Sequence, residues 1–287
     1  MEDNSVISSF VIGVGILNDP SGVAVDSLRN VYVTDTSYGL IQKFSSDGKF
    51  LTKWGSFGIN DAEFRFPSGI VVDSSGNLYV ADTDNRRIQK FSSDGKFMTK
   101  WGSAKGDGEL SDPHGIAIDS SGNVYVVDSS SDRIQKFSSD GKFMTKWGSK
   151  GSGDGEFLSP GGIAIDSLGN VYVTDSSNTR IQKFSSDGKF MTKWGSKGIN
   201  DAEFRFPSGI AVDRSDNVYV VDITNNCIQK FSSDGKFMTK WGSRGSGEKQ
   251  LNSPHGIAID SSGNIYVADA NNHRIQVFRI SVSSRTT

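Results

Sequence analysis

The chain is poor in the residues that mark several common classes of protein. It has 1 cysteine in 287 residues, so an internal disulfide framework is impossible and no oxidising compartment is indicated. Its 3 histidines leave few partners for nucleophile–histidine catalysis. The formal net charge is −2, which does not favour a generic binder of polyanions.

Long hydrophobic runs are also absent. No apolar run approaches the roughly 18 residues that a membrane-spanning helix needs. The apolar stretch at 11–17 follows an acidic start, Met1-Glu2-Asp3, and lacks the basic region of a signal peptide. We therefore expect a soluble protein without a signal peptide and leave its compartment open. The motifs G-x-S-x-G, H-E-x-x-H, C-x-x-C and the Walker loop do not occur.

The few prolines all fall in one motif, P-x-G-[IV]-[AV]-[IV]-D, which recurs every 46 or 47 residues. These prolines are Pro20, Pro67, Pro113, Pro160, Pro207 and Pro254. The tryptophans keep the same period, at Trp54, Trp101, Trp147, Trp194 and Trp241. A period of this length indicates a repeat architecture, and it extends over nearly the whole chain.

Each repeat has the pattern of four short strands without a helix. In the second unit we expect strands at 69–73, 77–81, 87–91 and 96–101, all rich in Ile, Val, Tyr, Phe or Trp. The turns between them contain Ser-Gly-Asn or Asp-Gly, which supply the positive φ of tight hairpins. Six such units predict an all-β, six-bladed β-propeller with four-stranded antiparallel blades.

The repeats resemble the NHL-repeat family of propellers. NIYVAD at 264–269, followed by NNHRIQVF at 271–278, matches the repeat pattern of that family, and the match extends to all six units. The resemblance implies a single six-bladed propeller over residues 1–280, with blades that start near 20, 67, 113, 160, 207 and 254. Residues 281–287 would then be a C-terminal tail.

The last unit lacks its fourth strand, while the chain begins with an apolar segment that precedes the first proline motif. We expect residues 5–12 to complete the last blade as its outer strand and so to close the ring. The tryptophans close the outer strands of the other units at one fixed position. We therefore expect them to fill the seams between blades rather than to stack on nucleic-acid bases.

A longer symmetry is superimposed on the short one. The string GINDAEFRFPSGI occurs at both 58–70 and 198–210, and P-H-G occurs only at 113–115 and 254–256. Blades 1–3 therefore resemble blades 4–6. Together with the nearly identical SSDGKFMTKWGS segments, this pattern is typical of recent amplification or of consensus-like engineering.

One face of the propeller carries variable loops, and the other carries stereotyped turns. The variable loops are the connections between blades and those between the second and third strands, and variable loops on a rigid scaffold are where binding usually occurs. We expect the ligand-binding face there. Its candidate residues are Tyr38, Phe64, Phe66, Arg86, Arg87, Arg133, Arg180, Phe204, Phe206, His273 and Arg274.

His114 and His255 are the candidate metal ligands. Each follows the proline at the start of an innermost strand, in blades 3 and 6, so both face the central channel, where imidazoles can bind a divalent metal. The repeats also resemble those of the peptidyl-hydroxyglycine amidating lyases, whose P-H histidines are zinc ligands. Serine or glycine occupies the equivalent position in the other blades, so a third imidazole is absent, and polar lining of the channel is the alternative role.

The aspartates that end the second strands recur once in each blade, and arginine begins the third strand in four of them. We expect these charges to position loops rather than to catalyse. Leucine and cysteine, Leu40 and Cys227, replace the arginine in blades 1 and 5. Acidic residues outnumber basic ones on the loop-rich face, so nucleic acid is not an expected ligand.

These patterns predict a monomeric, non-catalytic binding or scaffold propeller with no cofactor, which presents its loop-rich face to a protein, peptide or glycan. One alternative is a metal-dependent lyase or hydrolase with a channel metal at His114 and His255. A second is an engineered or consensus-like repeat protein without an evolved ligand. Enzymatic activity is left open, and we assign no catalytic residue.

Overall fold

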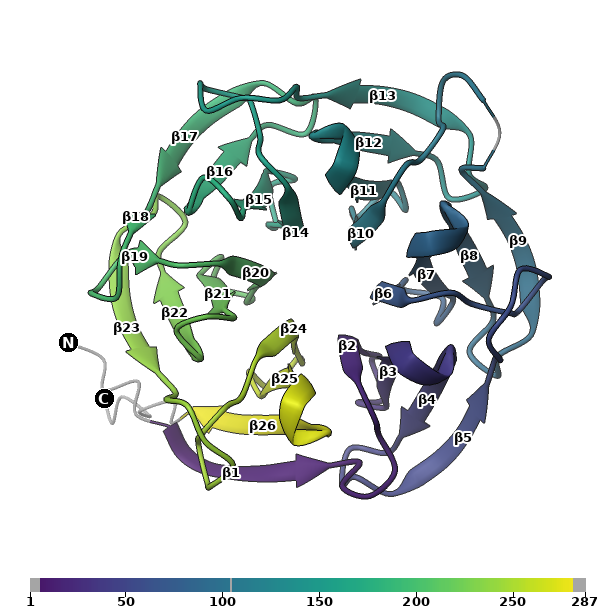
Figure 1. The fold of residues 1–287 in the computed structure, drawn as a ribbon, viewed down its shortest axis with the longest axis horizontal. Helices are drawn as coiled ribbons and strands as arrows, with labels where there is room; N and C mark the ends of the chain where they lie inside the picture. Colours follow the sequence, from purple (N-terminus) through teal and green to yellow (C-terminus); the bar gives the residue numbers. More distant parts are fainter. Residues whose placement is uncertain (1–5, 104, 281–287) are drawn as a thin grey trace, which may run out of the picture.

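The computed structural model describes residues 6–103 and 105–280, and this part of the chain forms six four-stranded sheets around a central channel (Figure 1). The predicted six-bladed all-β propeller is confirmed. Within the same ranges, no helix is long and apolar enough to cross a bilayer. Short 3-10 helices follow the second strand of four blades: η1 (Thr36–Tyr38), η2 (Thr83–Asn85), η3 (Ser129–Ser131) and η4 (Ala270–Asn272).

Each blade is antiparallel, and its strands run outwards from the channel in chain order, except in blade 6. Blade 1 contains β2 (Pro20–Val25), β3 (Val31–Asp35), β4 (Leu40–Phe44) and β5 (Phe50–Trp54). Blade 2 contains β6 (Pro67–Val72), β7 (Leu78–Asp82), β8 (Arg87–Phe91) and β9 (Phe97–Trp101). Blade 3 contains β10 (Pro113–Ile118), β11 (Val124–Asp128), β12 (Arg133–Phe137) and β13 (Phe143–Trp147).

The second half repeats this arrangement. Blade 4 contains β14 (Pro160–Ile165), β15 (Val171–Asp175), β16 (Arg180–Phe184) and β17 (Phe190–Trp194), and a short parallel pair follows, β18 (Ser196–Lys197) with β19 (Glu203–Phe204). Blade 5 contains β20 (Pro207–Val212), β21 (Val218–Asp222), β22 (Cys227–Phe231) and β23 (Phe237–Trp241). Blade 6 contains β24 (Pro254–Ile259), β25 (Ile265–Asp269), β26 (Arg274–Ile280) and β1 (Val6–Ile12).

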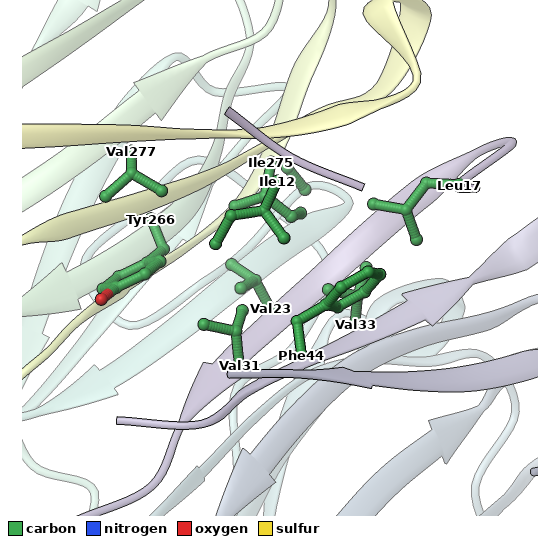
Figure 2. Packing of buried hydrophobic residues seen from close by; sticks show 10 residues of the cluster. Ile12, Leu17, Val23, Val31, Val33, Phe44, Tyr266, Ile275 and Val277 are labelled. Atoms are coloured by element: carbon green, nitrogen blue, oxygen red, sulfur yellow. The ribbon is translucent and has the colours of Figure 1, made fainter. Parts of the chain in front are cut away.

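The N-terminal strand closes the ring. β1 pairs antiparallel with β26, with Ile12 opposite Ile275, and lies on the outside of blade 6 (Figure 1). Figure 2 shows Ile12 among apolar side chains from blades 1 and 6, including Val31 and Val277. Closure by an N-terminal strand therefore agrees with the prediction, whereas residue 5 and the predicted tail at 281–287 lie outside the described residues.

The tryptophans fill the seams between neighbouring blades, as predicted. The Trp54 ring lies 6.4 Å from that of Tyr32 in its own blade and 6.3 Å from that of Phe91 in the next. A Cβ on Gly95 would lie 2.7 Å from the Trp54 indole, so the Asp-Gly turn of one blade accepts the tryptophan of the previous blade. At the closing seam Ile12 takes this place, 3.2 Å from a Cβ built on Gly48.

The innermost strands approach one another backbone to backbone. A Cβ on Gly69 would lie 2.2 Å from the carbonyl oxygen of His114, and one on Gly209 would lie 2.2 Å from that of His255. The glycine of each P-x-G motif makes the equivalent contact with the next blade, at 2.2–2.6 Å. Glycine is therefore required at this position, and the narrow ring directs the preceding residue toward the channel.

Buried aspartates anchor the loops between blades. Asp82 has no exposed surface, and its carboxylate accepts hydrogen bonds from the Arg65 backbone N–H (2.8 Å) and from Arg87 Nε (2.7 Å). The remaining guanidinium donors of Arg87 bind the loop carbonyls of Ile59, Asn60 and Glu63 at 2.7–2.9 Å. We call this arrangement, an arginine bound to the buried aspartate and to three loop carbonyls, the arginine clamp. The same clamp recurs at Arg180 and Arg274, whereas Arg133 donates to Asp128 and to one loop carbonyl.

Closure by β1 predicts a large cost for truncating its buried side chain. Ile12→Ala removes a side chain that is 1% exposed, and we expect a loss of about 2–5 kcal/mol of unfolding free energy. Val11→Ala on the same strand, where the side chain is 40% exposed, is the control and should cost less than about 1 kcal/mol. Urea unfolding measures both, and equal losses would contradict closure through Ile12.

The clamp predicts that one partner of the buried ion pair cannot be removed cheaply. Arg180→Ala leaves the fully buried carboxylate of Asp175 without its cation, and we expect a loss of about 3–5 kcal/mol. The control is Arg86→Ala, which removes an exposed arginine that directly precedes Arg87 of blade 2. It should change stability by less than about 0.5 kcal/mol. A loss below 1 kcal/mol for Arg180→Ala, from the same unfolding curves, would refute the clamp as an anchor.

Candidate active site at the channel mouth

His114 and His255 line one cavity at the centre of the ring, as the sequence predicts. About 420 Å³ of space, open to solvent, lies among the P-x-G segments of all six blades. Apart from the two histidines, the lining consists of Ser21, Gly22, Ser68, Gly69, Gly115, Gly161, Gly162, Ser208, Gly209 and Gly256. The imidazoles are therefore the titratable side chains of this lining.

His114 is paired with an acid from its own blade. Its Nε2 lies 3.3 Å from Oδ1 of Asp112, and its side chain is 43% exposed. Asp112 is itself held in place, because its other oxygen accepts from Ser130 Oγ at 3.0 Å and its backbone N–H donates to Asp128 at 3.0 Å. The hydrogen bond with His114 lowers the pKa of Asp112, against the opposing effect of burial. The carboxylate thus stays ionised and orients the imidazole.

The surroundings of His255 lower its pKa. Burial lowers its pKa below the ordinary 6.5, and the charge of His114 acts in the same direction, while the nearby carboxylate of Asp19 partly opposes both. Asp19 belongs to the neighbouring blade 1. A histidine with a lowered pKa is neutral at neutral pH and is ready to accept a proton.

The donor set does not make a resident metal centre. Within residues 6–103 and 105–280, no group of three or more His, Cys, Asp or Glu side chains is placed to hold a metal ion. Two imidazoles on opposite blades, with serine and glycine between them, do not supply the three or four protein ligands of a usual zinc site.

Two of the predicted aromatic ligand contacts are wrong. Phe64 and Phe204 have no exposed surface and pack on Phe91 and Phe231, with ring centroids 5.6 and 5.8 Å apart. Both anchor their own loops in the seams. The next aromatic residue in each loop, Phe66 or Phe206, is 50% or 39% exposed and directly precedes a channel proline.

The arginines at the start of the third strands were also predicted to contact a ligand, and the structure corrects this prediction. Arg87, Arg180 and Arg274 are at most 9% exposed, and their guanidinium groups are used in the clamps, so they do not present themselves to a ligand. Arg133 is more open, with a side chain 24% exposed, but it too binds its aspartate. These residues hold the loop face in shape.

Tyr38, Arg86 and His273 lie on the loop face, and their role in ligand binding stays a prediction. The Tyr38 side chain is 53% exposed, and Arg86 is exposed at the end of η2. The His273 ring contacts the backbone carbonyl of Asn18, which links blade 6 to the loop that leads into blade 1. His273 therefore also contributes a contact between blades at the closing seam.

Sequence reasoning missed two groups of residues. The glutamine of R-I-Q, such as Gln89, binds both the buried aspartate and a loop carbonyl, and its place two residues after the arginine on one strand face could have indicated this. Asp19 and Asp112, the acids beside the histidines, form the only two D-P pairs in the chain. Their recurrence before channel prolines was an available signal.

Comparisons with solved structures find the same fold. Virginiamycin B lyase from Staphylococcus aureus, 18% identical, covers 95% of this chain and 99% of its own with a TM-score of 0.68. A catalytically inactive His-to-Ala variant of that lyase with quinupristin, 17% identical, covers 96% and 89% with a TM-score of 0.65. A gluconolactonase from Xanthomonas campestris, 15% identical, covers 98% and 96% with a TM-score of 0.71.

Sequence comparison identifies the family. No curated protein sequence matches the chain. The model of the virginiamycin B lyase family, in contrast, matches residues 14–275, from the loop after β1 to the third strand of blade 6. A propeller family is thus established, whereas the finer assignment to NHL repeats stays a prediction. The chain belongs to the virginiamycin B lyase family.

Proposed function

We propose that this propeller is an enzyme that performs acid–base chemistry on a small molecule at the channel mouth. The observation that carries the proposal is the His114–Asp112 pair, which shares one cavity with His255. Membership of a lyase family supports it. The scaffold role predicted from the sequence has no support in the comparisons, since the named neighbours are a lyase and a gluconolactonase. Repeats of the NHL type would be the scaffold of this enzyme.

The two histidines suit opposite roles. His255, neutral because of its lowered pKa, would accept a proton from the substrate. His114, oriented by its contact with Asp112, would donate a proton to the leaving group. In a lyase reaction the electron pair of the broken C–H bond forms the new double bond as the leaving group departs. The same base could instead activate water in a hydrolysis.

The rim suggests how a substrate would be held. Phe66 and Phe206 are exposed, on opposite blades, at the positions equivalent to Asp112. They would contact apolar parts of the substrate, while Asp19 and Asp112 keep the region between them acidic. Streptogramins and lactones, the compounds in the names of the neighbours, are the first substrates to test.

The activity is tested with quinupristin and gluconolactone as substrates and product formation as the readout. His255→Gln should lower kcat/KM by about 10²–10⁴-fold, the usual contribution of a general base, and His114→Gln by a similar factor. Ser208→Ala, another residue of the channel lining, is the control and should retain activity. In the wild type the acidic limb of the pH profile should lie below pH 6.5, because the lowered pKa keeps His255 deprotonated until then.

Turnover that survives both histidine substitutions would contradict this assignment. An acidic limb above pH 6.5 would also contradict it, because it requires a base with a raised pKa. If the wild type turns over neither compound, these compounds are not its substrates. If, in addition, their binding is the same in the wild type and in both histidine variants, the site itself is refuted.

The channel metal predicted from the two histidines is tested by elemental analysis. With only two imidazoles from the lining, we expect well under one transition metal ion per purified chain after exposure to zinc and dialysis. The double variant His114→Ala/His255→Ala is the matched control and should give the same content. One metal ion per wild-type chain that is lost in the double variant would establish a metal site and contradict our expectation.

A further inference from the structure

We propose that blade 5 holds a binding site for a guanidinium group, at the place where blades 2, 4 and 6 carry their own clamping arginine. The site is formed by the Asp222 carboxylate and the backbone carbonyls of Ile199, Asn200 and Glu203. It is separate from the channel mouth, and it does not depend on the proposed function.

Blade 2 shows what the site is built to hold. Its loop, GINDAEFRFPSGI at 58–70, is identical to the loop at 198–210 in blade 5. In blade 2, Arg87 fills the centre of the loop, with Nε on Asp82 at 2.7 Å and its terminal nitrogens on the carbonyls of Ile59, Asn60 and Glu63 at 2.7–2.9 Å. In blade 5, the residue equivalent to Arg87 is Cys227.

The blade 5 loop keeps its shape without the arginine. Glu203 caps Asn200 at 3.0 Å, as Glu63 caps Asn60 at 2.9 Å in blade 2. Ala202 donates to Gln229 at 2.9 Å and has a φ of +61°, the value also found for Ala62 in the blade 2 loop. The amide of Asn225 binds the carbonyl of Gly198 at 2.9 Å, against 2.8 Å for the equivalent bond in blade 2. The three loop carbonyls therefore retain the arrangement that accepts a guanidinium.

The carboxylate of the site lacks the cation that four of its five counterparts have. Asp222 has no exposed surface, like Asp82, but its hydrogen bonds come from neutral donors, the backbone N–H groups of Arg205 and Phe206 and both nitrogens of Asn225. Ion pairs of arginine with the equivalent aspartate are present in blades 2, 3, 4 and 6. A buried carboxylate is strongly stabilised by a cation, so this position favours a positively charged ligand.

Neither of the neighbouring side chains replaces the arginine. Burial, together with the charge of Asp222, raises the pKa of the Cys227 thiol to about 12, so the thiol is neutral. The Lys240 ammonium donates to the Ile199 carbonyl at 3.2 Å, but its ion pair is with Asp201, at 2.9 Å. An ammonium is compact and cannot reproduce the planar fork of a guanidinium that bridges a carboxylate and several carbonyls.

The ligand is therefore a planar cation with several N–H donors. A free guanidinium compound or the side chain of an arginine in a peptide would supply this chemistry. The Lys240 side chain is 35% exposed, so the outer side of the site is bordered by a flexible group in contact with solvent. Displacement of the Lys240 contact with Ile199 would open the route to the carbonyls.

Thermal unfolding with guanidinium chloride as the probe tests the site, at millimolar concentrations far below those that denature proteins. Sodium chloride at equal ionic strength is the reference. At about ten times the Kd, binding to the native state should raise the wild-type Tm by about 2–4 °C relative to sodium chloride, in a saturable way. Cys227→Arg fills the site with its own guanidinium, so its Tm should be higher from the start and should not respond to the probe.

Arg87→Cys is the matched variant on the identical loop of blade 2. It should lower the Tm in sodium chloride and gain a second guanidinium site, so calorimetry should give two sites per chain against one for the wild type. Methylguanidinium and N-acetylarginine amide distinguish the two sources of the ligand: binding of the first alone assigns a free small molecule, and binding of both assigns an arginine side chain. Equal responses of the wild type and Cys227→Arg to guanidinium would overturn the proposal.

Discussion

The close approach of the six innermost strands is the constraint on which the rest of the molecule depends. Each P-x-G glycine faces a carbonyl of the next blade at a distance that leaves no room for a Cβ. The ring is therefore narrow, and the residue between the proline and the glycine lines the channel. Because His114 and His255 occupy that position in blades 3 and 6, a contact between backbones brings together two imidazoles that are 141 residues apart in sequence.

The second organising interaction is the buried carboxylate at the end of each second strand. It binds the backbone of the loop that enters its own blade. In four blades an arginine pairs with this aspartate and also binds one or more carbonyl groups of the same loop. These bonds give the loop face a shape that does not depend on a ligand. The chemistry of the channel mouth then depends on a few departures from the repeat, among them Asp19, Asp112 and the two histidines. Cys227 is a departure of another kind, since it removes a cation and leaves its acceptors in place.

Much of the fold could be predicted because it depends on periodic residues. The prolines, tryptophans and Asp-Gly turns recur at fixed offsets, and each has the same structural role in every blade that contains it. The loop face was harder, because neighbouring residues there differ in burial without a periodic pattern. Phe64 is fully buried while Phe66 is half exposed, and Arg87 is buried while Arg86 is exposed.

Identical sequence does not settle local conformation either. Phe66 has a left-handed φ of +51°, whereas Phe206, in the same 13-residue string, is not among the residues with positive φ. Their carbonyls also differ, since Ile223 donates to Phe206 while Asp84 donates to Arg65, one residue earlier. The contacts that separate the two come from flanking segments of different sequence. The pairing of His114 with Asp112 likewise follows from the path of the chain into the inner strand.

The central claim is that His255 and His114 act on each other across one cavity, and an NMR titration of the imidazoles tests it most directly. With 3 histidines in the chain, each signal can be assigned by substitution. Our account predicts that His255 titrates below pH 6.5 and that its pKa rises in His114→Gln, because the charge of His114 contributes to the lowering. A midpoint of His255 at or above 6.5 that is unaffected by His114→Gln would contradict it.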